Sequence, residues 1–168
     1  MDMKSGDSLD CNNINIRKPT IAELPALAEL RWALCSDDEE TELPVDKARF
    51  TEQFLKREKE LEAMGNLINY VAEKDAELIG VISLILVNKI PSPCEINGCW
   101  GYVTNVYVRP AYRSHGVGEK LLSFVKEQAI ADKCELLVVW PSDRSYPFYK
   151  RAGFKSEKRE QDPLVLVL

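Results

Sequence analysis

The feature that most constrains this chain is a glycine-containing loop that joins a strand to a helix within residues 105–130. Val106 and Val108 alternate with their neighbours as in a β-strand, and Arg109-Pro110 ends that strand. Residues 113–118 read RSHGVG and lead into an apolar stripe with helical spacing. A glycine turn at the start of a helix presents unpaired backbone N–H groups at the positive end of the helix dipole. The segment therefore predicts an anion site, with phosphate as the expected ligand.

Two widespread phosphate-binding motifs do not match this loop. A dinucleotide fingerprint requires a third glycine three residues after Gly118, where Leu121 stands. A P-loop requires Gly-Lys-Ser/Thr, whereas the sequence here continues Gly118-Glu119-Lys120. Two interpretations stay open: a different phosphate motif, or a solvated loop whose glycines serve only the entry into the helix.

The remaining pattern is Arg-x-x-Gly-x-Gly after a strand that ends in Tyr-Val-x-Pro. It resembles the acetyl-CoA signature of the GNAT superfamily of N-acetyltransferases. Further along the chain, Phe148-Tyr149 and Gly153-Phe154 resemble the segment that follows the fifth strand in that superfamily. Ser142 stands where the superfamily commonly has Asn, and Ser145 where it has Ala. The Ser142 departure weakens the assignment of that position to the usual contact with the pantetheine or CoA.

The resemblance implies acetyl-CoA as the co-substrate. In the superfamily, the loop amides hold the CoA pyrophosphate and the preceding strand pairs with the pantetheine. The backbone N–H of Val108, beside a bulge, is implied to polarise the thioester carbonyl. The residues expected to contact acetyl-CoA are Val106, Tyr107, Val108, Arg113, Ser114, His115, Gly116, Val117, Gly118 and Ser145.

Tyr149 is the expected catalytic residue, because the resemblance puts its hydroxyl near the CoA sulfur. A phenol with an ordinary pKa of about 10 keeps its proton at neutral pH and can act as a general acid. The alternative is a half-buried aromatic side chain on an amphipathic helix. Cys134 lies in an apolar context without a nearby base, which favours direct transfer over a covalent acetyl-cysteine. The general base that would deprotonate the amine is not identified. Residues 39–42 include three glutamates as candidates, and the alternative is that they form a solvated acidic loop.

Composition limits the partners and the compartment. The chain has 168 residues, 45% hydrophobic and 29% charged, with a net charge of −5, which indicates one globular domain. Because no basic arm is present, nucleic acid is not an expected partner. The 5 cysteines are irregularly spaced and only 1 histidine is present, so reduced thiols and no metal site are expected. The longest apolar run, residues 81–87, is too short to span a membrane, so a cytoplasmic protein is expected.

The order of elements predicts an α/β fold with a mixed sheet, of the GNAT type. A flexible tail over residues 1–12 and a single domain over residues 13–168 are expected. Thr20 and Glu23 form a capping-box pattern before the first helix, which an acidic break from residue 36 is expected to end. The expected strands cover residues 13–17, 67–73, 78–87, 99–108, 136–140, 154–158 and 164–168, and the later helices cover residues 46–64, 116–133 and 143–151.

The run at 136–140 is continuous in apolar residues, which is typical of a strand buried on both faces. The predicted function is transfer of an acetyl group from acetyl-CoA to a primary amine of a small molecule or peptide. The alternatives are a non-catalytic acyl-CoA-binding regulatory module and an unrelated phosphate-binding α/β protein. Pairing of two copies as a homodimer stays open.

Overall fold

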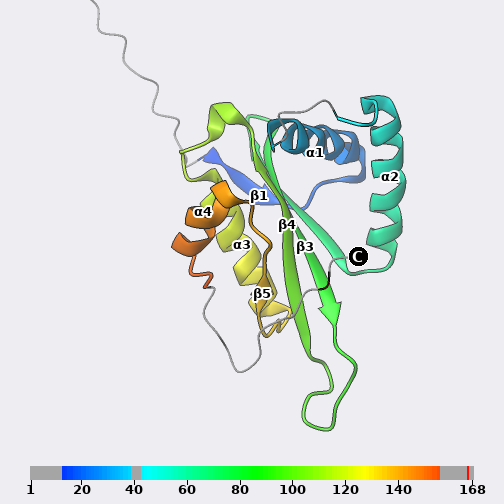
Figure 1. Ribbon diagram of the computed structural model, residues 1–168, viewed down its shortest axis with the longest axis vertical. Coiled ribbons are helices and arrows are strands. Elements are labelled where there is room, and N and C mark those ends of the chain that lie inside the picture. Colours follow the sequence, from blue (N-terminus) through cyan, green and yellow to red (C-terminus); the bar gives the residue numbers. More distant parts are fainter. Residues whose placement is uncertain (1–12, 39–42, 156–165, 167–168) are drawn as a thin grey trace, which may run out of the picture.

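A five-stranded mixed sheet forms the centre of the computed structural model, which describes residues 13–38, 43–155 and 166. The strand order is β1-β2-β3-β4-β5, antiparallel up to β4 and parallel between β4 and β5 (Figure 1). The strands are β1 (Asn15–Arg17), β2 (Leu67–Lys74), β3 (Glu77–Asn88), β4 (Cys99–Val108) and β5 (Leu137–Val138). The helices are α1 (Leu24–Asp38), α2 (Lys47–Ala63), α3 (Val117–Ala131) and α4 (Tyr146–Arg151). The mixed α/β sheet expected from the sequence is confirmed.

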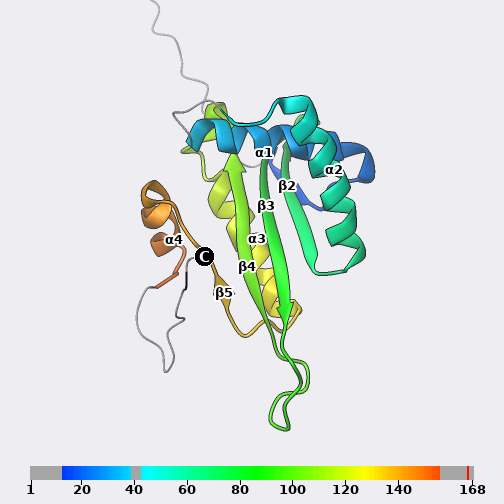
Figure 2. The ribbon, with the colours of Figure 1, turned by 45° about the vertical axis from the view of Figure 1, so that its right-hand side comes forward.

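Helices cover both faces of the sheet, so the strands carry two apolar layers (Figure 2). On one face, Ile82, Leu84 and Val103 pack against α3 and α4. On the other face, Val71 and Val81 pack against α1. Alternate residues along β3 therefore enter different cores, as the pleat requires.

The first helix begins as its sequence predicts. Thr20 and Glu23 form the capping box, and a 3-10 turn at Ile21–Glu23 precedes α1. The start of α1 at Leu24 places Pro25 in the first turn, where its missing N–H costs nothing. The helix then continues to Asp38, so the break expected from residue 36 is wrong. This extension carries an acidic side chain, Asp37, to the end of α1.

The turn between β2 and β3 is as tight as its sequence predicts. Asp75 and Ala76 both have positive φ angles, 49° and 64°. Two consecutive left-handed residues match the twist of an antiparallel hairpin. The hairpin thereby fixes the register of β3 on β2, and β4 follows as the next antiparallel neighbour.

The expected strand at 136–140 is shorter and less buried than its apolar run indicates. Only Leu137–Val138 is a strand, both residues are half-buried, and Trp140 is 58% exposed. The apolar run therefore reflects one packed face, followed by an exposed aromatic side chain, Trp140. The prediction that this strand is buried on both faces is wrong. The strands expected at 154–158 and 164–168, and the tail at 1–12, fall largely or wholly outside the described residues.

The short β5 leaves part of the β4 edge without a partner strand. The two strands pair only at Gly101–Leu137 and Tyr102–Val138, whereas β4 continues to Val108. Beyond Tyr102, the edge of β4 that faces β5 therefore has no β5 partner. We call this unpaired stretch of the β4 edge the splay. Within the described part of the chain, no helix has both the length and the apolar character needed to cross a membrane.

Candidate active site

The loop between β4 and α3 has the backbone geometry of an anion cradle. After a 3-10 turn at Pro110–Tyr112, Ser114 and Gly116 adopt positive φ angles of 63° and 75°. Gly116 is the N-cap of α3, and no side chain caps the helix there. The first N–H groups of α3 therefore have no intrahelical partner and lie at the positive end of the helix dipole. A non-glycine residue in the left-handed region, such as Ser114, is typical of functional loops.

Gly118 packs closely against Phe148. A Cβ atom at this position would lie 3.3 Å from Cε2 of Phe148 on α4. The ring of Phe148 also stacks edge-on against Tyr149, with centroids 4.9 Å apart. The glycine thus seats the start of α3 against the residue that precedes Tyr149. The two sequence motifs are in direct contact.

Arg113 faces α1 in this structure. Its Nη2 lies 2.6 Å from Oδ2 of Asp37, and its Nε donates to the carbonyl of Val108 at 2.9 Å. The guanidinium also lies 5.3 Å from the centre of the Tyr107 ring. The Tyr107 hydroxyl donates to the same Asp37 oxygen at 3.2 Å. Burial and the neighbouring Asp37 raise the pKa of Tyr107, which keeps this donor protonated.

Asp37 was not singled out from the sequence. It belongs to an acidic segment that is typical of a solvated loop, and only the three-dimensional structure brings it to Arg113. Arg144, in the turn before α4, donates to the carbonyl of Asp37 at 3.2 Å. The end of α1 is therefore held by arginines from both sides of the splay.

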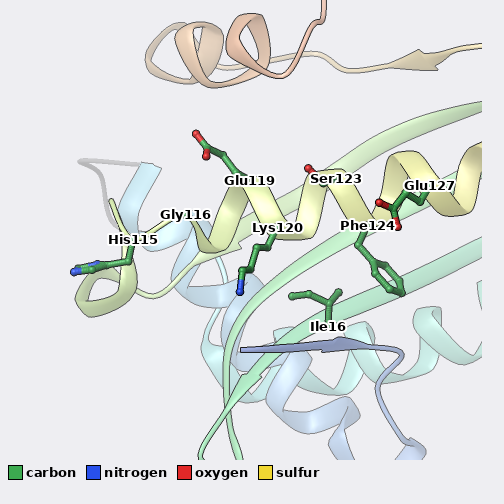
Figure 3. Close-up of a pocket in the computed structure, with 8 residues that line it drawn as sticks. All are labelled: Ile16, His115, Gly116, Glu119, Lys120, Ser123, Phe124 and Glu127. Atoms are coloured by element: carbon green, nitrogen blue, oxygen red, sulfur yellow. The ribbon is translucent and has the colours of Figure 1, made fainter. Parts of the chain in front are cut away.

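His115 is one of the residues that line a groove of about 460 Å³ between α3 and β1. Figure 3 shows its ring directed away from the helix, while Lys120 and Phe124 point towards Ile16 of β1. The His115 Nδ1 lies 2.6 Å from the carbonyl oxygen of Arg113. The groove also has Glu119, Ser123 and Glu127 in its lining, together with Gly116. Glu127 is the lining residue farthest along α3 from the glycine loop, so that end of the groove does not suit an anion.

The predicted contacts on β4 divide between the two faces of the strand. The side chains of Val106 and Val108 pack against the core under α3, so their contacts with a ligand in the splay are limited to the backbone. Tyr107 packs on the opposite face with residues of α1. Between Thr104 and Tyr107 of β4, the register with β3 shifts, because Thr104 pairs with Ser83 whereas Tyr107 pairs with Val81. This confirms a bulge in β4, located between Thr104 and Tyr107.

Tyr149 lies in the apolar core beside the splay. Its side chain is only 7% exposed, and its ring also contacts Phe154, with centroids 5.5 Å apart. Burial, and secondarily the nearby Tyr102, raises the pKa of Tyr149 to about 12. Its hydroxyl therefore stays protonated at neutral pH. Among the described residues, no hydrogen-bond partner occupies this hydroxyl.

Ser145 and Ser142 bond to each other at the start of α4. The Ser145 hydroxyl donates to the Ser142 carbonyl at 2.8 Å, and the Ser142 hydroxyl donates to Ser145 Oγ at 3.2 Å. Both hydroxyls thus serve the local turn. A ligand contact by Ser145 stays a prediction.

Cys134 does not have the properties of a nucleophile. Burial and the Cys99 thiol, whose Sγ lies 3.5 Å away, raise the pKa of Cys134 to about 12. The thiolate is the reactive form, so this cysteine is inert at neutral pH. Across residues 13–38 and 43–155, no three His, Cys, Asp or Glu side chains converge as a metal site would require.

The sequence and the fold both match known acetyltransferases. The sequence profile of the Acetyltransferase (GNAT) family matches residues 25–154. A glucosamine 6-phosphate N-acetyltransferase from Trypanosoma brucei brucei is 32% identical over 60 residues, which are 36% of this chain and 41% of that relative. This chain therefore aligns with less than half of the length of that curated relative.

Two solved structures share the fold. A predicted acetyltransferase with acetyl-CoA from Clostridium acetobutylicum has a TM-score of 0.73 and 22% identity, covering 90% of this chain and 96% of that one. The glucosamine-6-phosphate N-acetyltransferase from Arabidopsis thaliana has a TM-score of 0.66 and 20% identity, covering 90% and 97%. Identities this low support the fold alone. Because the family profile covers most of the chain, including both motifs, the protein belongs to the Acetyltransferase (GNAT) family.

Proposed function

We propose that this protein transfers an acetyl group from acetyl-CoA directly to a primary amine of a small molecule or peptide. The observation that carries the proposal is the contact between its two motifs. The glycine loop that opens α3 packs through Gly118 on Phe148, next to the buried and protonated Tyr149. An anion cradle and a proton donor are thus joined by a direct packing contact.

The glycine loop is the proposed site for the pyrophosphate of acetyl-CoA. Uncapped N–H groups of Val117 and Gly118 suit phosphate oxygens, and Ser114 and His115 border the same turn. Arg113 can add a guanidinium contact once it leaves Asp37. The pantetheine is assigned to the edge of β4 left free by β5, because its amides need backbone partners.

Acetyl-CoA supplies the acyl group as a thioester. In the reaction, the amine nitrogen forms a bond to the acyl carbon, and the bond from that carbon to sulfur breaks. The backbone N–H of Val108 is assigned to the carbonyl oxygen, where negative charge develops. Tyr149 is assigned to give its proton to the departing sulfur and to regain one from solvent. The proton lost by the amine nitrogen passes to water.

The names of the relatives indicate a class of acceptor for the panel. The relative from Trypanosoma brucei brucei and the structure from Arabidopsis thaliana are both named for glucosamine 6-phosphate. Another structure of the same fold is an aminoglycoside acetyltransferase in complex with sisomicin. Amino sugars therefore belong in any panel of acceptors. Polyamines, amino acids and peptides complete it.

The test is thiol release from acetyl-CoA across this panel, combined with binding of acetyl-CoA alone. Acetyl-CoA at a hundredfold excess over its Kd is expected to stabilise the fold by about 2.7 kcal/mol through mass action. At least one amine is expected to give thiol release well above the rate without enzyme. Binding without release for every amine would favour the acyl-CoA-binding module instead. The absence of both acetyl-CoA binding and thiol release would contradict the assignment of the glycine loop.

A further inference from the structure

A chain of four polar side chains crosses the sheet on the face covered by α1 and α2. Asn105 of β4 donates through Nδ2 to Oγ of Ser83 on β3 at 3.1 Å. Ser83 donates to Oδ1 of Asn69 on β2 at 2.5 Å, and Asn69 donates through Nδ2 to Oε2 of Glu58 on α2 at 2.7 Å. We call these residues the polar chain. Its members lie on one face because Ser83 alternates with Ile82 and Leu84, which enter the opposite core.

The carboxylate at one end sets the direction of every bond in the polar chain. An ionised Glu58 can only accept, so Asn69 must turn its NH₂ group towards it. The Asn69 oxygen then faces Ser83, whose hydroxyl donates to it and accepts from Asn105. This leaves the Asn105 Oδ1 atom as the free acceptor at the other end. The orientation of both amides thus follows from the network as a whole.

Asn105 combines an unpaired oxygen with an unusual backbone. Its Oδ1 is buried and has no hydrogen-bond partner among the described residues. Its φ angle is 50°, in the left-handed region, and it stands at the β4 bulge. Leaving a buried acceptor unpaired costs free energy, and so does a left-handed non-glycine residue within a strand. Both features at one residue indicate a group that is arranged for a ligand.

The position of Asn105 matches the acceptor side of the proposed reaction. It lies on β4 beyond the last pair with β5, and therefore on the splay. The glycine loop and Tyr149 belong to the α3 side of the sheet, whereas the Asn105 side chain is on the α1 and α2 side with Ser83. Once the α3 side holds the donor, the amine has to approach from the side of Asn105.

We propose that Asn105 positions the acceptor by taking a hydrogen bond from the amine N–H through Oδ1. One N–H fixed in this way leaves the nitrogen lone pair to point towards the acyl carbon. The polar chain acts as a mount for the amide and not as a proton wire, because amide nitrogens do not exchange protons readily with a base. The ligand class is therefore an N–H donor, and the inference rests on the proposed acetyl transfer.

The test compares Asn105→Ala and Ser83→Ala with Asn66→Ala. Asn66 is the matched control, because its Oδ1 is also buried and unpaired but lies before β2, two strands away from β4. In Asn105→Ala, kcat/KM for the amine is expected to fall by roughly tenfold or more, mainly through KM. Ser83→Ala, which frees the amide to rotate, is expected to give a smaller loss in the same direction. The Kd of acetyl-CoA should stay within roughly twofold in all three.

Unchanged amine kinetics in Asn105→Ala would overturn the inference while acetyl transfer stands. Equal losses in Asn105→Ala and Asn66→Ala would also overturn it, since they would reflect a general effect on folding. If the wild type acetylates no amine, the side-chain amide signals of Asn105 are followed by ¹⁵N NMR with CoA and glucosamine 6-phosphate. A shift of these signals, absent for Asn66, would support the inference although the proposed function fails. If the Asn105 signals do not shift, both the inference and the proposed acetyl transfer are overturned.

Discussion

The Asp37 carboxylate lies 2.6 Å from the Arg113 guanidinium and thereby ties the end of α1 to the loop that opens α3. An acidic side chain at the C-terminal end of a helix meets the negative end of its dipole, and the last turn of α1 has no basic residue. Arg113 compensates for this from another part of the chain. The cation predicted to meet phosphate is therefore paired with a carboxylate of α1.

This pairing predicts that Asp37→Asn tightens the binding of acetyl-CoA. An exposed ion pair is worth about 0.2–1 kcal/mol, so releasing Arg113 is expected to lower the Kd by about threefold. Isothermal titration calorimetry measures the change directly. Glu29→Gln is the matched control, because Glu29 also lies on α1 and its ion pair, with Lys47 of α2, is about half exposed. A Kd that rises or stays constant in Asp37→Asn would contradict a phosphate contact by Arg113.

The general acid is tested by Tyr149→Phe, which removes only the hydroxyl. Turnover is expected to fall by roughly 100-fold, whereas the Kd of acetyl-CoA stays constant. Tyr146→Phe, on the exposed side of the same helix, provides the control and should keep its activity. Full turnover in Tyr149→Phe would exclude the acid role.

The same residue makes a prediction about pH. Because burial raises the pKa of Tyr149 to about 12, the acid stays protonated well beyond the range in which a free tyrosine ionises. Once the amine is neutral, kcat should therefore show no decline up to about pH 10, the ordinary pKa of tyrosine. A decline centred on that value, absent in Tyr149→Phe, would show that Tyr149 is not shielded as described.

The base of the splay is sensitive to a single methyl group. A Cβ atom on Gly101 would lie 2.6 Å from Leu137 and 2.7 Å from Leu84, both of them core side chains. Gly101→Ala is expected to reduce the free energy of unfolding by about 1–3 kcal/mol and to weaken the β4–β5 pairing. In the control Gly98→Ala, the atoms met by the new methyl belong to the exposed side chains of Glu135, Glu95 and Lys89, which can move aside. Equal stability of the two variants in urea would contradict the packing described here.

Glu58 gives the polar chain a dependence on pH that can be measured as stability. Burial, opposed by the bond from Asn69 and reinforced by Glu62, raises the pKa of Glu58 above its ordinary value. The folded protein thus binds the proton of Glu58 more tightly than the unfolded chain does, although the carboxylate still forms at higher pH. The resulting stability is present below the unfolded pKa and is lost as the pH rises through the folded pKa. Glu58→Gln is therefore expected to be more stable than the wild type at neutral pH, with the difference vanishing in acid. Urea unfolding at both pH values checks this, and a loss of stability at neutral pH would contradict it.

Much of the donor side was predictable because its signals are local. The glycine loop, the capping box at Thr20 and the turn at Asp75 depend on the conformation of a few neighbouring residues, which the sequence specifies directly. The Phe148-Tyr149 motif adds a second fixed point. The structure brings this motif into contact with Gly118, so the predicted elements belong to one assembly.

The contacts of Asp37 and Asn105 were not predictable, for the opposite reason. Asp37 and Asn105 acquire their partners only when distant segments pack, Asp37 against Arg113 and Asn105 against Ser83. Nothing in their immediate neighbours distinguishes them from solvated polar residues. The excess length expected for β5 has a similar cause, because an apolar run does not reveal where a strand loses its partner.

The most direct test of the central claim is mass spectrometry of a single turnover with the best amine of the panel. The account predicts one N-acetylated amine for each thiol released, and no acetyl group on the protein, because Cys134 is held as a thiol. An acetylated cysteine that disappears as product forms, or thiol release without N-acetylated amine, would contradict direct transfer from acetyl-CoA.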